Sequence, residues 1–341
     1  MRLQLGRRPV AAIVCLFLLL VASALTWAQT RTLRLVSTGW PPFTDKAGAP
    51  RFALDLVEAA LTRIRQPSTT TIVEAAQFTP ALLTGDFDGS AAAWKDAERE
   101  RVLIFSEPYL ENRLVLVGRK GADVSATTLA SLAGRRMALV EGYSYGEQVE
   151  NSGPTFVRTK SDDDAVAQLL RGAVDYVLMD DLVVQYLVDN HSQEVQEKLQ
   201  IGTKPLVTRA LHLAIRRTYP DAQGIIDRFN AQLRGMITDR TYHRLLHVDW
   251  ISADVDGDGL FEYVPESDKA GATQPQRAYS IASTTEPDVP LTATAEPTPR
   301  RFYVGGSIYR DWASVPNRYK TSAGNPPSPS RATASLFRFS W

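Results

Sequence analysis

A short acidic segment near residue 254 carries oxygen ligands at regular spacing. In DVDGDGLFEYVPE, aspartates occupy alternate positions, a glycine follows at the turn, and a backbone carbonyl and a glutamate come next. This is the ligand order of a calcium-binding loop. The predicted ligands are Asp254, Asp256, Asp258, the carbonyl of Leu260, and Glu262. The spacing therefore predicts a structural calcium site.

The last ligand of that loop is missing. The twelfth position, where a bidentate glutamate completes the calcium shell, is Pro265, and Glu266 comes one residue late. We therefore expect modest calcium affinity. Magnesium is less suitable because its small octahedral shell accommodates many protein oxygens poorly. The alternative is that the three aspartates form only a solvated turn.

Two side chains in the first third of the chain are candidates for holding an organic ligand. Trp40 follows a predicted strand, 33–36, and precedes two prolines that stiffen its loop. Open α/β sheets place their ligands at the carboxyl ends of such strands. Arg99 lies in the charged stretch WKDAERER, and a guanidinium can meet a carboxylate at two points. The alternatives are a tryptophan packed on its own loop and a solvated arginine.

A third candidate lies in the middle of the chain. The segment VEGYSYGE follows the apolar strand 137–140 and is predicted to open a helix. Hydroxyl and backbone N–H groups at a helix N-terminus can receive an anion. Ser144 could equally be an ordinary N-cap.

The first residues indicate export. Arginines precede an apolar run, 10–25, which is typical of a secretory signal peptide cleaved after Ala24 or Ala28. An uncleaved membrane anchor is the alternative. Cys15, the only cysteine, lies in this run, so the mature chain can form no internal disulfide.

Charge and motifs exclude several classes of function. Residues 1–28 hold three arginines and no acidic residue, which leaves 35 Lys and Arg against 38 Asp and Glu, a net charge of about −3. No basic excess points to nucleic acid. The sequence has no phosphate-binding Gly-Lys-Ser loop, no nucleophile elbow and no cysteine nucleophile in the mature chain.

The remaining 313 residues are enough for one large or two medium domains. Apolar strands alternate with amphipathic stretches up to Trp250, for example a helix over 52–64 and a strand over 70–73. This alternation predicts an α/β fold with mostly parallel sheets. Beyond Trp250, 267–300 is rich in Pro, Thr, Ser and Ala and is predicted to be a flexible linker.

The order of segments from Thr32 to Trp250 resembles the family 3 extracellular solute-binding proteins, the type that captures amino acids for importers. The motifs are STGWPPFTD, RFALDLVEAALTRI, ERERVLIFSEPY, LAGRRMALVEGYSYGE, AVDYVLMDD, ALHLAIRR and IIDRFNAQLRGMITDRTYHRLL. The resemblance implies a type 2 periplasmic-binding-protein fold with two lobes, in which two mixed sheets flanked by helices are joined by a two-strand hinge. The hinge strands would be 114–117 and 210–216, and a largely irregular C-terminal tail would follow.

The resemblance also assigns roles to site residues. The carboxylate-binding arginine of the family lies six residues before a Phe-Ser pair, as Arg99 does before Phe105. Ser144 matches the family's hydroxyl position. Asp180 matches the aspartate that holds the ligand's ammonium; Asp181 is the alternative, with Asp180 then capping the next helix.

This chain departs from the family's pattern just before the arginine. Three alanines and Trp94 replace small or hydroxylated residues, and Asp96 and Ala97 replace the usual threonine and proline. Trp94 is expected either to stack on a large apolar ligand or to fill the cleft.

These observations give one predicted organisation. It comprises a signal peptide (1–28), lobe 1 (29–117 and 206–250), lobe 2 (118–205), a calcium-loop segment (251–266), a linker (267–300), a short ordered aromatic segment (301–320) and a disordered tail (321–341).

The predicted function is that of a monomeric periplasmic binding protein. It would bind a small solute, an amino acid or related carboxylate, and deliver it to an ABC importer or a sensory partner. The alternative is a periplasmic enzyme on the same fold, similar to cyclohexadienyl dehydratases, with a cleft carboxylate such as Glu141 as general acid or base.

Overall fold

The structure is a computed structural model that describes residues 31–246, 248–269, 271–272, 279–280 and 301–320. The predicted signal peptide, most of the predicted linker and the predicted tail lie outside the described residues. Contacts divide the chain into Met1–Thr32 and Leu33–Trp341, and the elements below all belong to the second unit. Among the described residues, no helix combines the length and the apolar character needed to cross a membrane.

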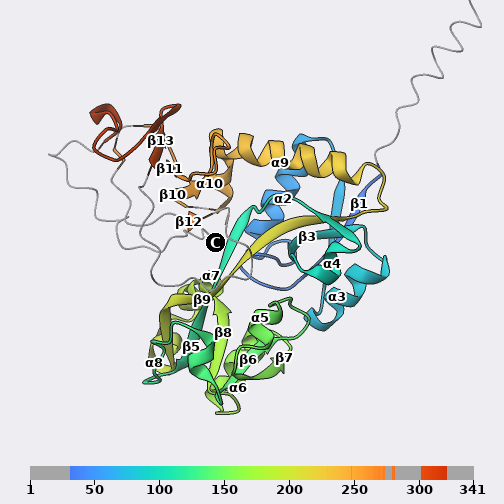
Figure 1. The fold of residues 1–341 in the computed structure, drawn as a ribbon, viewed down its shortest axis with the longest axis vertical. Coiled ribbons are helices and arrows are strands. Elements are labelled where there is room, and N and C mark those ends of the chain that lie inside the picture. Colours follow the sequence, from blue (N-terminus) through green and yellow to red (C-terminus); the bar gives the residue numbers. More distant parts are fainter. Residues whose placement is uncertain (1–30, 247, 270, 273–278, 281–300, 321–341) are drawn as a thin grey trace, which may run out of the picture. The chain divides into compact units, whose positions relative to one another are not determined.

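A mixed sheet organises residues 33–216 (Figure 1). The described residues form a nine-stranded sheet in the order β2-β1-β3-β9-β5-β8-β6-β7, with β4 paired to β9. The strands are β1 Leu33–Thr38, β2 Ser68–Val73, β3 Gly89–Trp94, β4 Leu103–Phe105, β5 Leu110–Arg119, β6 Arg136–Val140, β7 Thr155–Thr159, β8 Tyr176–Asp180 and β9 Leu199–Arg216. Parallel pairs occupy both ends of the sheet, and antiparallel pairs of β9 and β5 occupy its middle. The α/β fold is confirmed, with the mixed strand directions that the resemblance implies. The mostly parallel sheet that the alternation predicts is wrong, because β5 and β9 cross between the halves as antiparallel strands.

Two crossing strands, β5 and β9, join the two halves of this sheet. We call the half formed by β1–β4 lobe 1 and the half formed by β6–β8 lobe 2. β5 and β9 pair with each other, and β9 also pairs with β3 of lobe 1 while β5 also pairs with β8 of lobe 2. The two predicted sheets are therefore halves of one sheet. Their shared ladder shifts register beside Val115, opposite Pro205, which has no backbone N–H to donate.

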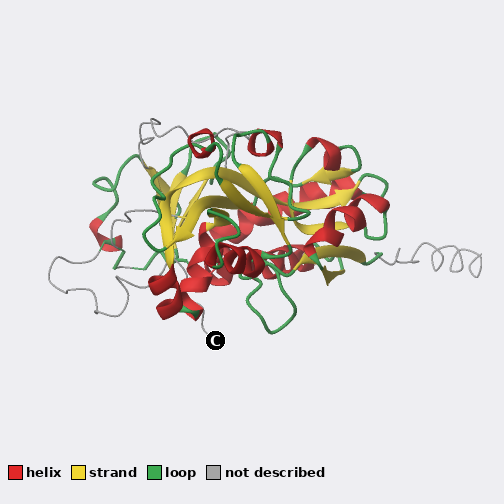
Figure 2. Cartoon of the chain, turned by 90° about the horizontal axis from the view of Figure 1, so that it is seen from below, coloured by secondary structure: helices red, strands yellow, loops and turns green. Residues whose placement is uncertain are grey.

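Helices cover both faces of the sheet (Figure 2). Those of lobe 1 are α2 Phe52–Arg63, α3 Ala75–Thr84, α4 Ala97–Glu100, α9 Ala222–Thr238 and α10 Thr241–Leu246. Those of lobe 2 are α5 Glu147–Glu150, α6 Asp162–Leu170, α7 Asp181–Asn190 and α8 Ser192–Lys198, with a short 3₁₀ turn, η1 Leu129–Leu132.

Local sequence explains why these helices form. α2 buries Phe52, Leu56 and Ala60 on one face, and it carries Asp55 in its first turn and Arg63 in its last, as the helix dipole favours. In lobe 2, Ser161 accepts a hydrogen bond from the backbone of Asp164 and so caps α6. Asp180 caps α7 in the same way through Leu182.

A second, smaller sheet follows the lobes. It has five strands among the described residues, in the order β12-β10-β11-β13-β14. They are β10 Trp250–Ala253, β11 Glu262–Pro265, β12 Tyr279–Ser280, β13 Arg301–Val304 and β14 Ser307–Tyr309, and η2 Asn317–Tyr319 follows. A separate apolar cluster of Phe302, Val304 and Val315 stabilises this sheet, and Trp250 and Trp312 pack against it. Aromatic residues of 301–320 thus pack against Trp250 of β10 and Tyr263 of β11.

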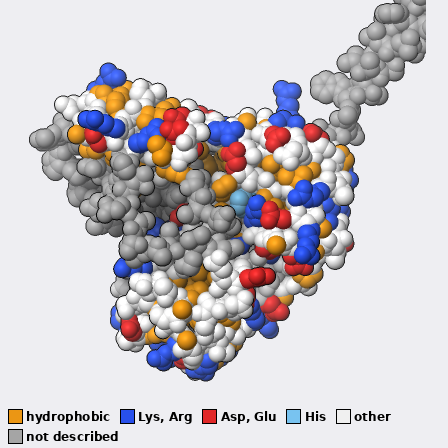
Figure 3. All heavy atoms as spheres, viewed as in Figure 1, with side chains coloured by type: hydrophobic (Ala, Val, Ile, Leu, Met, Phe, Trp, Pro, Cys, Tyr) orange, Lys and Arg blue, Asp and Glu red, His pale blue; other side chains and the backbone are white. Residues whose placement is uncertain are grey.

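Charges on the surface are mixed. Among the described residues on the face shown in Figure 3, Lys and Arg side chains lie interspersed with Asp and Glu.

The first prediction concerns the close approach of β3 to β9. A Cβ added to Gly89 would lie 2.0 Å from the carbonyl oxygen of Ala214. We expect Gly89→Ala to lower the free energy of unfolding by about 1–3 kcal/mol, because the two backbones must separate. The control is Gly235→Ala in α9, where a Cβ meets nothing within 4 Å. It should raise stability by about 0.5–1 kcal/mol through helix propensity. Urea unfolding of both variants measures this, and equal stabilities would contradict it.

The second prediction concerns a buried histidine in β9. His212 Nδ1 lies 2.8 Å from the carbonyl oxygen of Ser106, and burial lowers the pKa of His212 to about 4. Unfolding restores its ordinary pKa of about 6.5, so the unfolded state takes up a proton first as the pH falls. This contribution to stability is complete above pH 6.5 and is lost between pH 6.5 and pH 4.

Between pH 7 and pH 5 the loss from His212 should be about 2 kcal/mol. His212→Gln should reduce the pH dependence of the unfolding free energy by that amount. His191→Gln, at an exposed position, is the matched control. Identical pH dependence in wild type and His212→Gln would show that the prediction is wrong.

Candidate functional site

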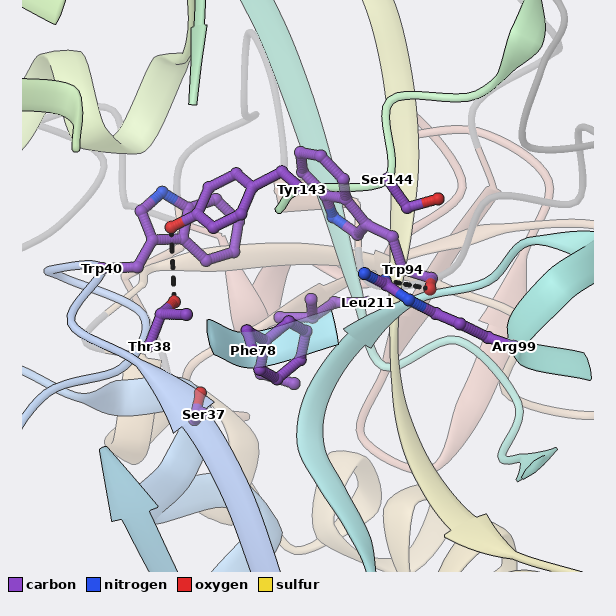
Figure 4. Close-up of a pocket in the computed structure, with 10 residues that line it drawn as sticks. Ser37, Thr38, Trp40, Phe78, Trp94, Arg99, Tyr143, Ser144 and Leu211 are labelled. Carbon is purple, nitrogen blue, oxygen red and sulfur yellow. Dashed lines mark hydrogen bonds between the residues drawn. The ribbon is translucent and has the colours of Figure 1, made fainter. Parts of the chain in front are cut away.

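A narrow pocket lies between loops of the two lobes (Figure 4). Its free volume is about 20 Å³, room for roughly one water molecule. The lining residues are Ser37, Thr38, Trp40, Phe78, Ala92, Trp94, Arg99, Tyr143, Ser144 and Leu211. The structure thus brings together Trp40, Trp94, Arg99 and Ser144 of the predicted site, and it leaves Asp180 outside this lining.

Aromatic rings form most of the wall. Trp94 ends β3, and its ring lies edge-on to Trp40 at 5.7 Å, to Tyr143 at 5.8 Å and to Tyr145 at 5.4 Å between centroids. Such edge-to-face contacts are favourable for aromatic pairs. Trp94 is only 5% exposed, so in this arrangement its ring fills the space at the base of the cleft. Trp40 also stacks on Phe43, which fixes it to its own loop.

Arg99, in α4, is a buried cation held by neutral and acidic groups. Its side chain is 2% exposed. Nη1 donates to the carbonyl of Trp94 at 3.0 Å, and Nη2 donates to Thr79 Oγ1 at 2.7 Å and to the carbonyl of Gly142 at 3.3 Å. Nε lies 3.4 Å from Asp96 Oδ2. Burial lowers the pKa of Arg99, and the attraction of Asp96 opposes that shift.

Ser144 does not cap a helix. The nearest helix, α5, begins three residues later, with Gly146 at its N-cap. The Ser144 hydroxyl donates instead to Asp96 Oδ2, the same oxygen that faces Arg99 Nε. Asp96 Oδ1 accepts from the backbone N–H of Arg99 at 2.8 Å and so caps α4. One carboxylate of lobe 1 therefore joins the arginine to the hydroxyl of lobe 2.

Asp180 is linked to Trp94 by hydrogen bonds through Asn112. Its Oδ1 caps α7 by accepting from Leu182, and its Oδ2 accepts from Asn112 Nδ2 at 3.0 Å. Asn112 Oδ1 in turn accepts from the indole N–H of Trp94 at 2.7 Å. Burial and the adjacent carboxylate of Asp181 raise the pKa of Asp180 well above its ordinary value. Asp181 pairs with Arg113 at 3.6 Å.

Glu141 does not face the pocket. It is exposed at the end of β6 and is absent from the lining residues. The described residues that line the pocket include no Asp or Glu. The nearby carboxylate of Asp96 is already paired with Arg99 and Ser144.

The acidic loop folds back on its own amide groups. Asp254 accepts from the backbone N–H groups of Gly257 and Gly259, at 2.7 and 2.9 Å, and Asp258 accepts from that of Leu260 at 2.8 Å. Carboxylate oxygens of Asp254, Asp256 and Glu262 lie within 4.8 Å of one another, a separation that one metal ion can bridge. The loop thus gathers three of its five predicted ligands. Leu260 is exposed.

Arg301 of β13 makes ion pairs with the same loop. Its Nη1 lies 2.6 Å from Asp258, its Nη2 lies 3.4 Å from Asp256, and its Nε lies 2.9 Å from the buried carboxylate of Glu262. The pKa of Asp258 is lowered by its hydrogen bond to Arg301, and burial raises that of Glu262. A guanidinium therefore offsets the negative charge that a metal would otherwise neutralise.

Sequence reasoning missed several groups that build these sites. Tyr143 and Tyr145 flank Ser144 in the segment already singled out, and their aromatic character was a usable signal. The other groups are distant in sequence from the residues that they contact. Thr79 bonds to Arg99 across 20 residues, Asn112 to Asp180 across 68, and Arg301 to Asp258 across 43. No local pattern marks them.

Known proteins similar to this chain were found in three comparisons. Residues 34–252 match the family of bacterial extracellular solute-binding proteins, family 3. The "ABC transporter arginine-binding protein 1" of Escherichia coli K12 is 25% identical over 218 residues, which are 62% of this chain and 86% of that protein.

Solved structures show the same two-lobed architecture. An ancestral arginine-binding protein bound to arginine aligns with a TM-score of 0.54 and 25% identity over 64% of this chain and 98% of that one. The T. maritima arginine-binding protein ArgBP, as its P235GK mutant, aligns with a TM-score of 0.53 and 25% identity over 63% of this chain and 93% of that one. Since the family match covers residues 34–252, more than half of the sequence, this chain belongs to the bacterial extracellular solute-binding proteins of family 3.

Proposed function

We propose that this protein captures a small solute, an amino acid or a related carboxylate, between its lobes and delivers it to a membrane importer or sensory partner. One observation carries the proposal: a buried arginine, Arg99, stands in an aromatic-walled pocket lined from both lobes. A guanidinium in a desolvated pocket binds a carboxylate strongly and with defined geometry.

The other end of the solute would be held on the Asp180 side. Asp180, Asn112 and Trp94 form a continuous hydrogen-bonded chain that ends at the pocket wall. If the ring of Trp94 turns aside, a solute ammonium can reach the carboxylate of Asp180 or that of Asp181. Trp94 would then contact the solute's side chain and select its size.

Similar proteins support the choice of solute. The E. coli protein is an arginine-binding protein, and an ancestral relative was solved with arginine and with glutamine. Those assignments belong to those proteins, and the amino-acid class is our proposal for this one. Export to the periplasm through a signal peptide (1–28), and a monomeric state, complete the proposal.

An enzymatic role on the same fold has less support. The carboxylate that we considered as general acid or base of such an enzyme, Glu141, lies outside the pocket lining. A test for turnover of prephenate or arogenate would reveal such an activity.

We also propose that the acidic loop binds calcium, with Asp254, Asp256, Asp258, the Leu260 carbonyl and Glu262 as ligands. The spacing of these residues and the grouping of three carboxylates within 4.8 Å support it. The role would be structural, since β10 and β11 enclose the loop between their ends. Arg301 would have to move aside for the ion to bind.

The third prediction tests the solute site. Arg99→Ala should weaken amino-acid binding by about 2–5 kcal/mol, because the solute's carboxylate loses a desolvated partner. Arg101→Ala, an exposed arginine two residues away, removes the same charge and should leave affinity unchanged. A thermal-shift screen with amino acids identifies the solute, and titration calorimetry then compares the variants. An affinity of Arg99→Ala within threefold of wild type would contradict the assignment.

The fourth prediction tests the calcium loop. Calorimetry on the mature protein should show calcium binding with Kd of about 10⁻⁴ to 10⁻³ M. Asp256→Ala with Asp258→Ala should abolish it, and Arg301→Ala should strengthen it because the competing cation is removed. Arg310→Ala, at a 90% exposed site in the same segment, is the control. Absence of calcium uptake at millimolar concentration in both wild type and Arg301→Ala would show that the loop is only a polar turn.

A further inference from the structure

The pocket's arginine already faces a carboxylate of this chain. Asp96 Oδ2 lies 3.4 Å from Arg99 Nε and also accepts the hydrogen bond of Ser144. The proposed function assigns Arg99 to the solute's carboxylate, and Ser144 is a predicted ligand-binding residue that lines the same pocket. Asp96 thus faces the same guanidinium that a solute's carboxylate would need.

Helix capping alone does not require an acid at this position. One oxygen of Asp96 caps α4, and a serine, threonine or asparagine would supply an equivalent oxygen. The second oxygen and the negative charge are directed at Arg99 and at lobe 2. The charge is therefore explained by this contact and not by the cap.

The lobes meet through groups of the chain itself. The carbonyl of Gly142, in lobe 2, accepts from Arg99 Nη2 and from Thr79 Oγ1, at 3.3 and 2.9 Å. The hydroxyl of Tyr143 lies 3.3 Å from Thr38 Oγ1. With the Ser144–Asp96 bond, these contacts tie the segment 142–144 to lobe 1. Lobe closure is thereby stabilised without any bond to a solute.

Gly142 shows how close this approach is. Its φ is +81°, and a Cβ there would lie 2.2 Å from the carbonyl oxygen of Ala75 in α3. Only glycine fits both the backbone conformation and the space. The segment of lobe 2 therefore lies directly on the first turn of α3, where a bulkier residue would hold the lobes apart.

A solute carboxylate and Asp96 cannot both pair fully with Arg99. Two carboxylates at one buried guanidinium repel each other. A second buried guanidinium, that of Arg209, lies near enough to act on Arg99, and its Nη2 donates to the carbonyl of Lys95. The donors of Arg99 that point to Thr79, Gly142 and Trp94 are engaged already. An entering carboxylate must therefore displace Asp96, which also holds the Ser144 hydroxyl, from Arg99 Nε.

We propose that Asp96 is a specificity-determining residue of the cleft: an internal carboxylate that competes with the solute's carboxylate for Arg99 and holds the lobes together before solute binds. The competition with solute rests on the proposed function; the contact between the lobes does not. Asp96 would thus weaken the binding of every solute that relies on a carboxylate.

The test uses Asp96→Asn and Asp96→Thr, which keep a capping oxygen and remove the charge. Glu98→Gln is the matched control, because this exposed residue of the same helix changes the charge equally but attracts Arg99 less than Asp96 does and makes no side-chain hydrogen bond to it. Small-angle X-ray scattering of the mature protein without solute reports lobe separation, and calorimetry with the amino acids found in the thermal-shift screen reports affinity.

We expect both Asp96 variants to have a larger radius of gyration than wild type without solute, while Glu98→Gln matches wild type. We expect them to bind amino acids about tenfold more tightly or better, equivalent to about 1.4 kcal/mol. An unchanged radius of gyration in both variants overturns the proposal, and so does amino-acid affinity equal to or below that of wild type. If the variants open but neither they nor wild type bind any amino acid, the proposed function fails and the role of Asp96 in closure stands.

Discussion

The burial of one positive charge, that of Arg99, constrains the region where the lobes meet. A buried guanidinium is stable only if its donors are satisfied and its charge is balanced. Here the charge is balanced by Asp96 in lobe 1. The Nη groups of Arg99 donate to carbonyls of both lobes and to the Thr79 hydroxyl of lobe 1, while Nε makes no hydrogen bond. The packing of Tyr143 over the tryptophans and the glycine at position 142 both follow from bringing lobe 2 close enough to supply those groups.

The crossing strands make this meeting possible. β5 and β9 run through both lobes and pair over most of their length, so the loops of each lobe emerge beside the same pair of strands. Their ladder shifts register beside Val115 and Pro205, where the hydrogen bonding is least regular.

The C-terminal sheet contains a second buried charge that is balanced by a residue distant in sequence. Glu262 is fully buried, and its charge is balanced by Arg301, which β13 brings beside β11. The two aspartates nearest the guanidinium are exposed and share it. Arg301 therefore supplies the positive charge that balances the carboxylates of this loop.

The sequence by itself determined the class of fold and the elements that build it. Apolar patterning located β1, α2 and β6 within two residues of their observed ends, since burial depends mainly on local spacing. It also placed Trp40, Trp94, Arg99 and Ser144 in one site, through the order of the motifs that carry them.

Only the tertiary structure decided which groups these side chains contact. Ser144 bonds to Asp96 across 48 residues, Asp180 is linked to Trp94 through Asn112, and Arg301 reaches the acidic loop across 43 residues. Pairing of this kind depends on how β5, β9 and β13 position distant loops, and a charged side chain takes whichever partner that packing brings within reach. Local sequence sets where a residue lies along its element, but the partner of a buried charge is fixed by the whole fold.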